Sequence, residues 1–121
     1  MIIQESGENY LETILLLQKK NGCVRSIDVA AALNFSKASI SRAMSILRRE
    51  NYIIMEADGN IKLTDNGMAK AQGVLERHLV ITAFLEKNLG VSHEIADRDA
   101  CRIEHIISPE TFDRIKEQVH K

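Results

Sequence analysis

The stretch SIDVAAALNFSKASISRAMSILRRENYIIMEADGNIKL, residues 26–63, decides the fold. Its first part, residues 26–34, predicts a short helix capped by Ser26, and a three-residue break at 34–36 follows it. The next part predicts a second capped helix, in which the apolar side chains recur at helical spacing and line one stripe: Ile40, Ala43, Met44 and Leu47. Two short helices across a tight turn form a helix-turn-helix.

A β-hairpin is predicted directly after these helices. Residues 52–55 (YIIM) and 61–63 (IKL) are short β-prone runs, and between them stands Asp58-Gly59, a dipeptide typical of hairpin turns. A hairpin in this position is the wing of a winged helix-turn-helix.

Helical patterns continue on both sides of this stretch. A first helix is expected over residues 6–20, a long one from Thr64 to about Asn88, a further one from Ser92 through Ile107, and a last one from Ser108-Pro109. The apolar stripes of residues 74–89 and 95–107 have no partner in so short a chain unless a second copy covers them. The fold class is therefore mainly α with a small β-hairpin wing: a winged helix-turn-helix domain over residues 1–71, followed by a helical dimerisation domain over residues 72–121.

Composition describes an ordinary globular chain of 121 residues, with 45% hydrophobic and 27% charged residues. The net charge of −1 does not favour a nonspecific nucleic-acid binder, but residues 25–50 carry five basic against two acidic side chains, a local balance of +3. Two cysteines are too few for a disulfide scaffold, and the sequence shows neither a signal peptide nor an apolar run of membrane-spanning length. We expect a cytoplasmic protein.

The second helix of the helix-turn-helix carries small polar and basic side chains away from its apolar stripe. Hydroxyl groups can donate to phosphates or base edges, a lysine can neutralise a phosphate, and an arginine can reach a guanine O6/N7 pair. The predicted DNA-reading residues are Ser36, Lys37, Ser39, Ser41 and Arg42. A solvated helix face is the plainer interpretation of the same pattern.

The segment Ala100-Cys-Arg-Ile-Glu-His105 predicts half of a transition-metal site. Cys101, Glu104 and His105 stand at i, i+3 and i+4, so on a helix all three would project from one face. Other helices would have to complete the coordination sphere, and they offer Asn9, Glu12, His78 and Asp97. The alternative is that Cys101 is a core residue and Glu104 with His105 a surface pair.

Several stretches resemble the family of metal-dependent bacterial repressors typified by the diphtheria toxin repressor and the manganese transport regulator. The matching stretches are GENYLETILLL, IDVAAALNFSKASISRAMSILRRENYI, DGNIKLTDNG, VLERH and DACRIEHIIS, and they span nearly the whole chain in the family's order. The resemblance implies a homodimer whose metal-bound form binds a palindromic operator. It also implies that the five residues named above fall on DNA-reading positions.

The resemblance also assigns metal ligands. Asn9, Cys101, Glu104 and His105 match the family's principal site, and Glu12 and His78 match positions of a second ion in the manganese-type members. In the iron-type members His78 belongs to an ancillary site.

Three departures from the family pattern stand out. Asn9 replaces a methionine or an aspartate, and its neutral amide is a weaker ligand. Asp97 and Thr82 stand where iron-type members have a histidine and a glutamate. The sequence ends at Lys121, before the small β-barrel domain of the iron-type members, so we expect a short member or a part of a longer protein.

These observations together predict a metal-dependent DNA-binding transcriptional repressor of metal-homeostasis genes, with no catalysis. A thiolate favours softer ions and carboxylates favour harder ones, so Fe(II) or Mn(II) is the expected cofactor, with Zn(II) and Co(II) as possible substitutes. One alternative is a metal-independent winged-helix regulator that senses an organic ligand. The other is a small metalloenzyme, although no separate general base accompanies the predicted ligands.

Overall fold

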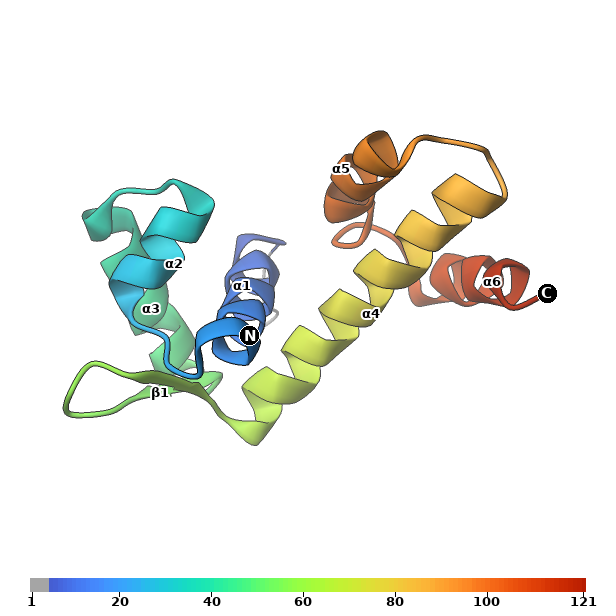
Figure 1. The fold of residues 1–121 in the computed structure, drawn as a ribbon. Helices are drawn as coiled ribbons and strands as arrows, with labels where there is room; N and C mark the ends of the chain where they lie inside the picture. The colour runs from blue at the N-terminus through green and yellow to red at the C-terminus, as the bar shows by residue number, and fades with distance from the viewer. Residues whose placement is uncertain (1–4) are drawn as a thin grey trace. The chain divides into compact units, whose positions relative to one another are not determined.

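The computed structural model describes residues 5–121 of the chain, which form six helices and one hairpin (Figure 1). The elements, in chain order, are α1 (Glu5–Asn21), α2 (Ser26–Leu33), α3 (Lys37–Arg49), β1 (Ile53–Met55), β2 (Ile61–Leu63), α4 (Asp65–Lys87), α5 (His93–Ile103) and α6 (Pro109–Val119). They divide into two compact units, one up to Gln72 and one from Gly73 to Lys121, and α4 runs through the boundary. The mainly helical fold with a winged helix-turn-helix is as the sequence predicts.

The first unit is built around the apolar faces of α1 and α3. Leu11 and Ile14 on α1 and Ile40 and Met44 on α3 are buried, because helical spacing places them on one side of each helix. Ser36 caps α3, since its Oγ accepts a hydrogen bond from the backbone N–H of Ser39 at 3.2 Å. The exposed side of α3 is therefore held in a defined register over a packed core.

The hairpin pairs β1 with β2 antiparallel, and Ile54 stands opposite Lys62. Ile53 and Ile61 face the core, whereas Ile54 and Lys62 are exposed. Gly59 occupies the turn with φ +89°, a conformation that glycine adopts without strain. This hairpin follows α3 directly, as a wing does (Figure 1).

The beginning of α4 packs tightly against the hairpin segment. Thr64 caps this helix through its Oγ1, which accepts from the N–H of Gly67 at 3.0 Å. A Cβ atom at Gly67 would overlap the Tyr52 carbonyl oxygen, so only glycine fits there. The start of α4 is thereby fixed to the DNA-binding unit.

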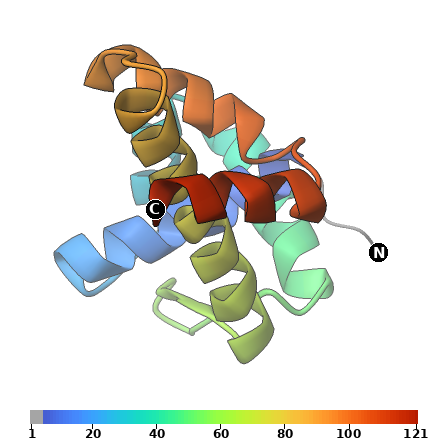
Figure 2. The ribbon, with the colours of Figure 1, turned by 90° about the vertical axis from the view of Figure 1, so that its right-hand side faces the viewer.

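The second unit consists of the C-terminal part of α4 with α5 and α6, which lie against different sides of it (Figures 1 and 2). Its core is formed by Ile81, Ala100 and Phe112, one from each helix. Ser92 and Ser108 cap α5 and α6, and Pro109 occupies the first turn of α6, where its missing N–H costs nothing.

Two local expectations were wrong. The N-cap of α2 is Arg25, not Ser26, because the backbone N–H of Arg25 donates to the Asp28 carboxylate at 2.9 Å. Helix α5 ends at Ile103 rather than continuing through Ile107. The second difference places two of the predicted metal ligands, Glu104 and His105, after the last residue of the helix.

Candidate metal centre and DNA-reading surface

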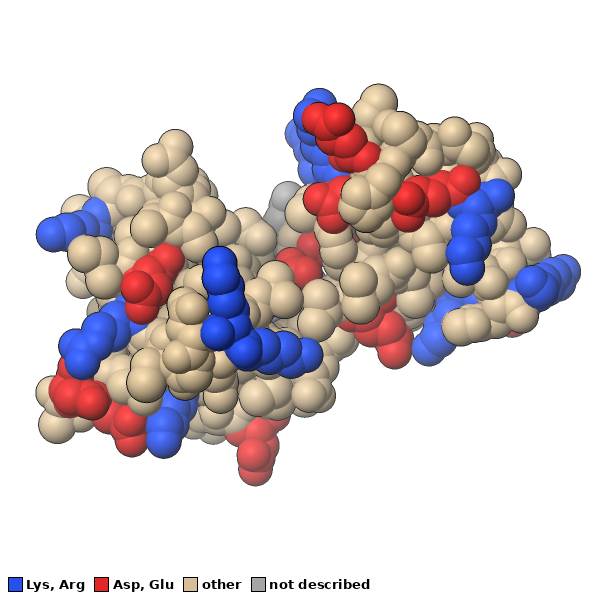
Figure 3. All heavy atoms as spheres, in the orientation of Figure 1, with Lys and Arg blue, Asp and Glu red and all other residues tan. Residues whose placement is uncertain are grey.

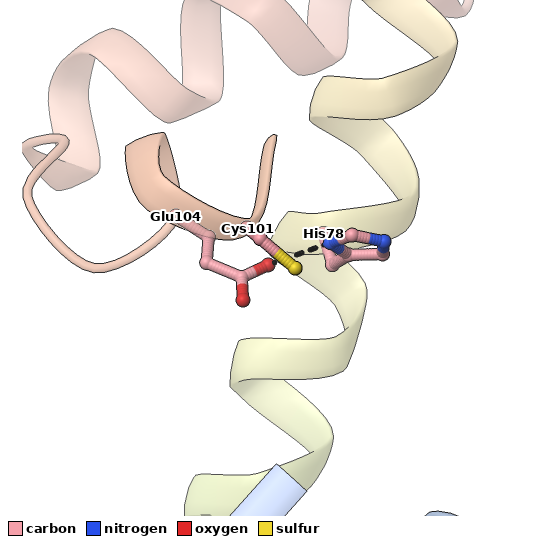
Figure 4. A group of neighbouring side chains, drawn as sticks. All are labelled: His78, Cys101 and Glu104. Atoms are coloured by element: carbon pink, nitrogen blue, oxygen red, sulfur yellow. Dashed lines mark hydrogen bonds and ion pairs between the residues drawn. The ribbon is translucent and has the colours of Figure 1, made fainter. Parts of the chain in front are cut away.

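Three candidate ligands from α4 and the end of α5 converge in the second unit. The imidazole of His78, the thiol of Cys101 and the carboxylate of Glu104 each offer a ligand atom, and these atoms all lie within 4.8 Å of one another (Figure 4). His78 comes from the middle of α4, while Cys101 and Glu104 lie about one turn apart at the end of α5 (Figure 4). The core contacts between these two helices bring the three side chains together.

Glu104 is the buried residue of this group, with a side chain that is 0% exposed. Its Oε2 lies 3.0 Å from Nδ1 of His78. Its Oε1 accepts no hydrogen bond from the described residues and lies 3.3 Å from Nε2 of His105. A buried carboxylate oxygen without a hydrogen-bond donor is costly unless a cation satisfies it, so this donor set fits a bound metal ion.

Asp97 extends the group along α5. Its Oδ1 lies 2.8 Å from Nε2 of His78, so both nitrogens of the imidazole face a carboxylate oxygen. Thr82, one turn after His78, donates its hydroxyl to the His78 carbonyl at 2.7 Å and is buried. Thr82 therefore supports the backbone of α4.

The helix predicted to carry Cys101, Glu104 and His105 ends earlier than expected, at Ile103. Glu104 is the C-cap of α5 and His105 lies in the turn beyond it. Cys101 and Glu104 converge with His78, and Nε2 of His105 lies 3.3 Å from the second oxygen of Glu104. Its role as a ligand stays a prediction.

The two remaining candidates, Asn9 and Glu12, lie on α1 in the first unit. Glu12 is buried and Asn9 half-buried, positions unusual for residues that would only solvate a helix. Their participation in the metal centre stays a prediction.

Sequence reasoning did not single out Arg77, the residue before His78. Its Nη1 donates to the carbonyl oxygen of Glu104 at 3.2 Å. The contact depends on how α4 packs on α5, so the sequence does not predict it. The sequence shows only that Arg77 is the neighbour of a candidate ligand.

The predicted DNA-reading residues all lie on the exposed side of α3 or at its cap, and all five are exposed: Ser36, Lys37, Ser39, Ser41 and Arg42. Two of them also interact with each other, because the hydroxyl groups of Ser36 and Ser39 lie 3.0 Å apart. Lysine and arginine side chains are interspersed with acidic ones on the face shown in Figure 3. The register of α3 and the exposure of these five residues are what indicate a DNA-reading surface.

A winged helix-turn-helix followed by a helical unit with converging thiol, imidazole and carboxylate groups defines a metal-dependent transcription regulator. The chain belongs to the family of iron-dependent repressors. Residues 3–61 match the N-terminal DNA-binding domain of that family, and residues 64–121 match its metal-binding and dimerisation domain.

Individual relatives agree with this assignment. An uncharacterised HTH-type transcriptional regulator of Methanocaldococcus jannaschii is 32% identical over 115 residues, covering 94% of this chain and 92% of the relative. The transcriptional regulator MntR of Escherichia coli O6:H1 is 37% identical over 113 residues, covering 93% of this chain and 72% of that protein.

Solved structures share the fold. IdeR of T. acidophilum superposes with a TM-score of 0.84 at 25% identity, covering 100% of this chain and 56% of that one. A manganese-dependent transcriptional repressor in complex with manganese superposes with a TM-score of 0.87 at 23% identity, covering 94% and 52%. The chain spans just over half the length of these two structures.

The chain is thus a metal-dependent transcriptional repressor with a DNA-binding domain and a metal-binding dimerisation domain. Its family consists of transcription regulators and not of enzymes, so the alternative of a small metalloenzyme is wrong. The organic-ligand alternative is set aside as well, because the second half of the chain matches a metal-binding domain. No helix within residues 5–121 has the length and apolar character needed to cross a membrane.

Proposed function

We propose that Fe(II) or Mn(II) activates this repressor to bind a palindromic operator as a homodimer in the cytoplasm, and that it controls genes of metal-ion homeostasis. Residues 1–71 would form the DNA-binding domain and residues 72–121 the metal-binding and dimerisation domain. The proposed metal ligands are drawn from both: Asn9, Glu12, His78, Asp97, Cys101, Glu104 and His105.

The observation that carries this proposal is the buried carboxylate of Glu104. One of its oxygens lies 3.0 Å from His78, the other accepts no hydrogen bond from the described residues, and the thiol of Cys101 lies within the same 4.8 Å group. A group of this kind would be stabilised by a divalent ion, which would bind the carboxylate oxygen that accepts no hydrogen bond.

The donor set also bears on which metal is bound. The thiolate of Cys101 favours Fe(II), Co(II) or Zn(II), whereas the oxygens of Glu104, Glu12 and Asn9 favour Mn(II) or Fe(II). Fe(II) satisfies both tendencies and Mn(II) comes second. The manganese-dependent repressor that shares the fold supports keeping Mn(II) in the test.

Ligands on two units explain how metal binding would reach the DNA. Asn9 and Glu12 belong to α1, which contacts α2 of the helix-turn-helix, while the other proposed ligands belong to the second unit. If one ion bound ligands from both sets, it would restrain the two DNA-binding domains of the dimer. It would thereby shift the equilibrium between conformations of the dimer towards the form that binds DNA. By linkage, operator binding would tighten metal binding by the same factor.

The second unit exposes large apolar side chains that a second copy would cover. They are Leu79, Leu89, Ile95 and Ile106, with 49–75% of each accessible in the single chain. Exposed apolar side chains gathered in one small unit are typical of an association surface, and this unit matches a dimerisation domain. The proposed homodimer therefore forms through α4, α5 and the turn after α5.

The test measures binding to an operator duplex that is first selected from random DNA with the Mn(II)-loaded protein. Fluorescence anisotropy is then recorded anaerobically with Fe(II), Mn(II), Co(II) or Zn(II), and with a chelator. We expect the activating metal to tighten binding by roughly 5- to 150-fold, the usual range of allosteric coupling.

Two substitutions on the same stretch of chain make this test specific. Glu104→Gln keeps the shape of the side chain but removes its charge, and should abolish the response to metal. His105→Ala tests the predicted ligand beyond the helix and should weaken the response. Glu94→Gln, at an exposed position of α5, is the matched control and should respond like the wild type. An operator affinity that no metal changes, or a full response in Glu104→Gln, would refute the proposed function.

A further inference from the structure

Arg77 occupies a position that links all three helices of the second unit. It lies on α4 next to His78, and its Nη1 donates to the Glu104 carbonyl oxygen at 3.2 Å. Its guanidinium carbon lies 5.9 Å from the centre of the Phe112 ring on α6, within the distance of a cation–π contact. One side chain thus contacts the end of α5 and the core residue of α6.

The carbonyl that Arg77 contacts is one that a helix end leaves without an intrahelical donor. Glu104 is the C-cap of α5, and Ser108 is already the extended N-cap of α6, so α5 does not continue to satisfy it. The carbonyl end of a helix also carries partial negative charge, which a cation stabilises. A guanidinium suits this place because it is always charged and offers several fixed donors.

Glu104 is consequently held at two points by consecutive residues of α4. Arg77 holds its backbone carbonyl, and His78 faces its carboxylate at 3.0 Å. The backbone contact orients the turn from which the buried carboxylate projects. Small displacements of a ligand weaken metal sites, and the loss of a residue that orients a ligand typically weakens metal binding by about 10- to 100-fold.

We infer that Arg77 is a positioning residue for the metal centre: it fixes the end of α5 so that the Glu104 carboxylate faces His78 and Cys101, while Phe112 holds its guanidinium in place. This inference rests on the proposed metal-binding function. It assigns to α6, which contributes none of the proposed ligands, a part in setting metal affinity.

The experiment titrates the full chain with Co(II) and with Mn(II), after substitution of Arg77. The Co(II) absorption spectrum reports the coordination geometry and the thiolate bond of Cys101, and thermal unfolding of the metal-free protein reports structural damage. Arg77→Ala should weaken metal binding by about 10- to 100-fold, the range observed when a residue that orients a ligand is lost, and should alter the Co(II) spectrum. Its metal-free melting temperature should stay close to that of the wild type.

Two further variants show whether the planar guanidinium is responsible. Arg77→Lys keeps a cationic donor but loses the planar group that contacts both Glu104 and Phe112, so it should bind metal several-fold more weakly than the wild type and more tightly than Arg77→Ala. Arg98→Ala removes an exposed arginine of α5 that pairs with Glu94 one turn earlier in the same helix. It should leave metal affinity unchanged. If Arg77→Ala does not fold, Arg77→Lys carries the test by itself.

Failure of this inference differs from failure of the proposed function. If the wild type does not bind Co(II) or Mn(II), or if Glu104→Gln binds them equally well, the proposed function fails and the inference with it. If those two proteins behave as expected but Arg77→Lys binds metal like the wild type, only the inference is overturned. An equal loss of affinity in Arg98→Ala would also overturn it, because the effect would then come from net charge.

Discussion

Two basic side chains of α3 should contribute to DNA binding in different ways. Arg42 lies beyond the first turn of the helix, where a side chain can reach base edges, while Lys37 lies at its first residue, near the expected phosphates. Arg42→Ala should therefore cost about 1–3 kcal/mol on the operator and relax the preference at one base pair per half-site. Lys37→Ala should weaken all sequences alike and reduce the salt dependence by about one unit of slope.

Anisotropy titrations on operator and random duplexes at several salt concentrations check this difference. Ser45→Ala, at an exposed position two turns along the same helix, is the control. Equal losses on operator and random DNA for Arg42→Ala would mean that it contacts a phosphate rather than a base.

At the same scale, the sequence identified residues that could bind a metal, but it predicted the arrangement of their side chains less well. Cys101, Glu104 and His78 are recognisable by their chemistry, and they converge. Helix α5 ends at Ile103, earlier than predicted, and Arg77 was missed because its partner is a backbone carbonyl. A backbone acceptor leaves no trace in the pattern of side chains, so no spacing rule could reveal that contact.

Among the elements, α4 carries two glycines in opposite surroundings. A Cβ at Gly67 would collide with the backbone of Tyr52, whereas a Cβ at Gly73 would have no atom within 4 Å. Gly67→Ala should lower the free energy of unfolding by at least about 1–3 kcal/mol, the usual cost of overpacking. Gly73→Ala should raise it by about 0.5–1 kcal/mol, because alanine loses less entropy in a helix.

Urea unfolding of the two variants, followed by circular dichroism, gives both free energies under one condition. A stable Gly67→Ala variant would mean that the beginning of α4 is not held against the hairpin segment as described. A destabilised Gly73→Ala variant would show that this part of α4 is covered in the folded protein.

Element boundaries were predictable where a side chain determines them. Thr64, Ser36 and Ser108 cap their helices as the sequence indicates, because each hydroxyl accepts from a backbone N–H of the first turn. The start of α2 was shifted because a carboxylate within the helix, that of Asp28, accepts from the backbone of the residue before Ser26. Every residue type except proline can supply a backbone N–H, so the sequence did not identify the cap there.

For the whole molecule, we predict that metal removal leaves the dimer intact. The apolar side chains that would form the interface lie on the second unit and include none of the proposed ligands. Sedimentation of the chelated protein at micromolar concentration should show two subunits. Leu79→Glu, within the exposed apolar group, should give a monomer, and Leu16→Glu on α1 should not.

Hydrogen exchange is the companion measurement, and it tests whether α1 takes part in metal binding. If Asn9 and Glu12 ligate the metal, amide protection over residues 6–20 should rise when Mn(II) is added. The proposed link between metal, α1 and the DNA-binding domains would be contradicted if the metal-free protein were a monomer, or if Mn(II) left the protection of α1 unchanged.

The placement of His78 on one helix and Glu104 at the end of another has a consequence for the lifetime of the protein in the cell. A metal that binds only the folded form raises the free energy of unfolding once its concentration exceeds the dissociation constant. At a hundredfold excess the increase is about 2.7 kcal/mol. That increment would reduce the unfolded fraction on which cellular proteases act by roughly a hundredfold. Metal starvation would then shorten the half-life of the repressor as well as weaken its binding to DNA.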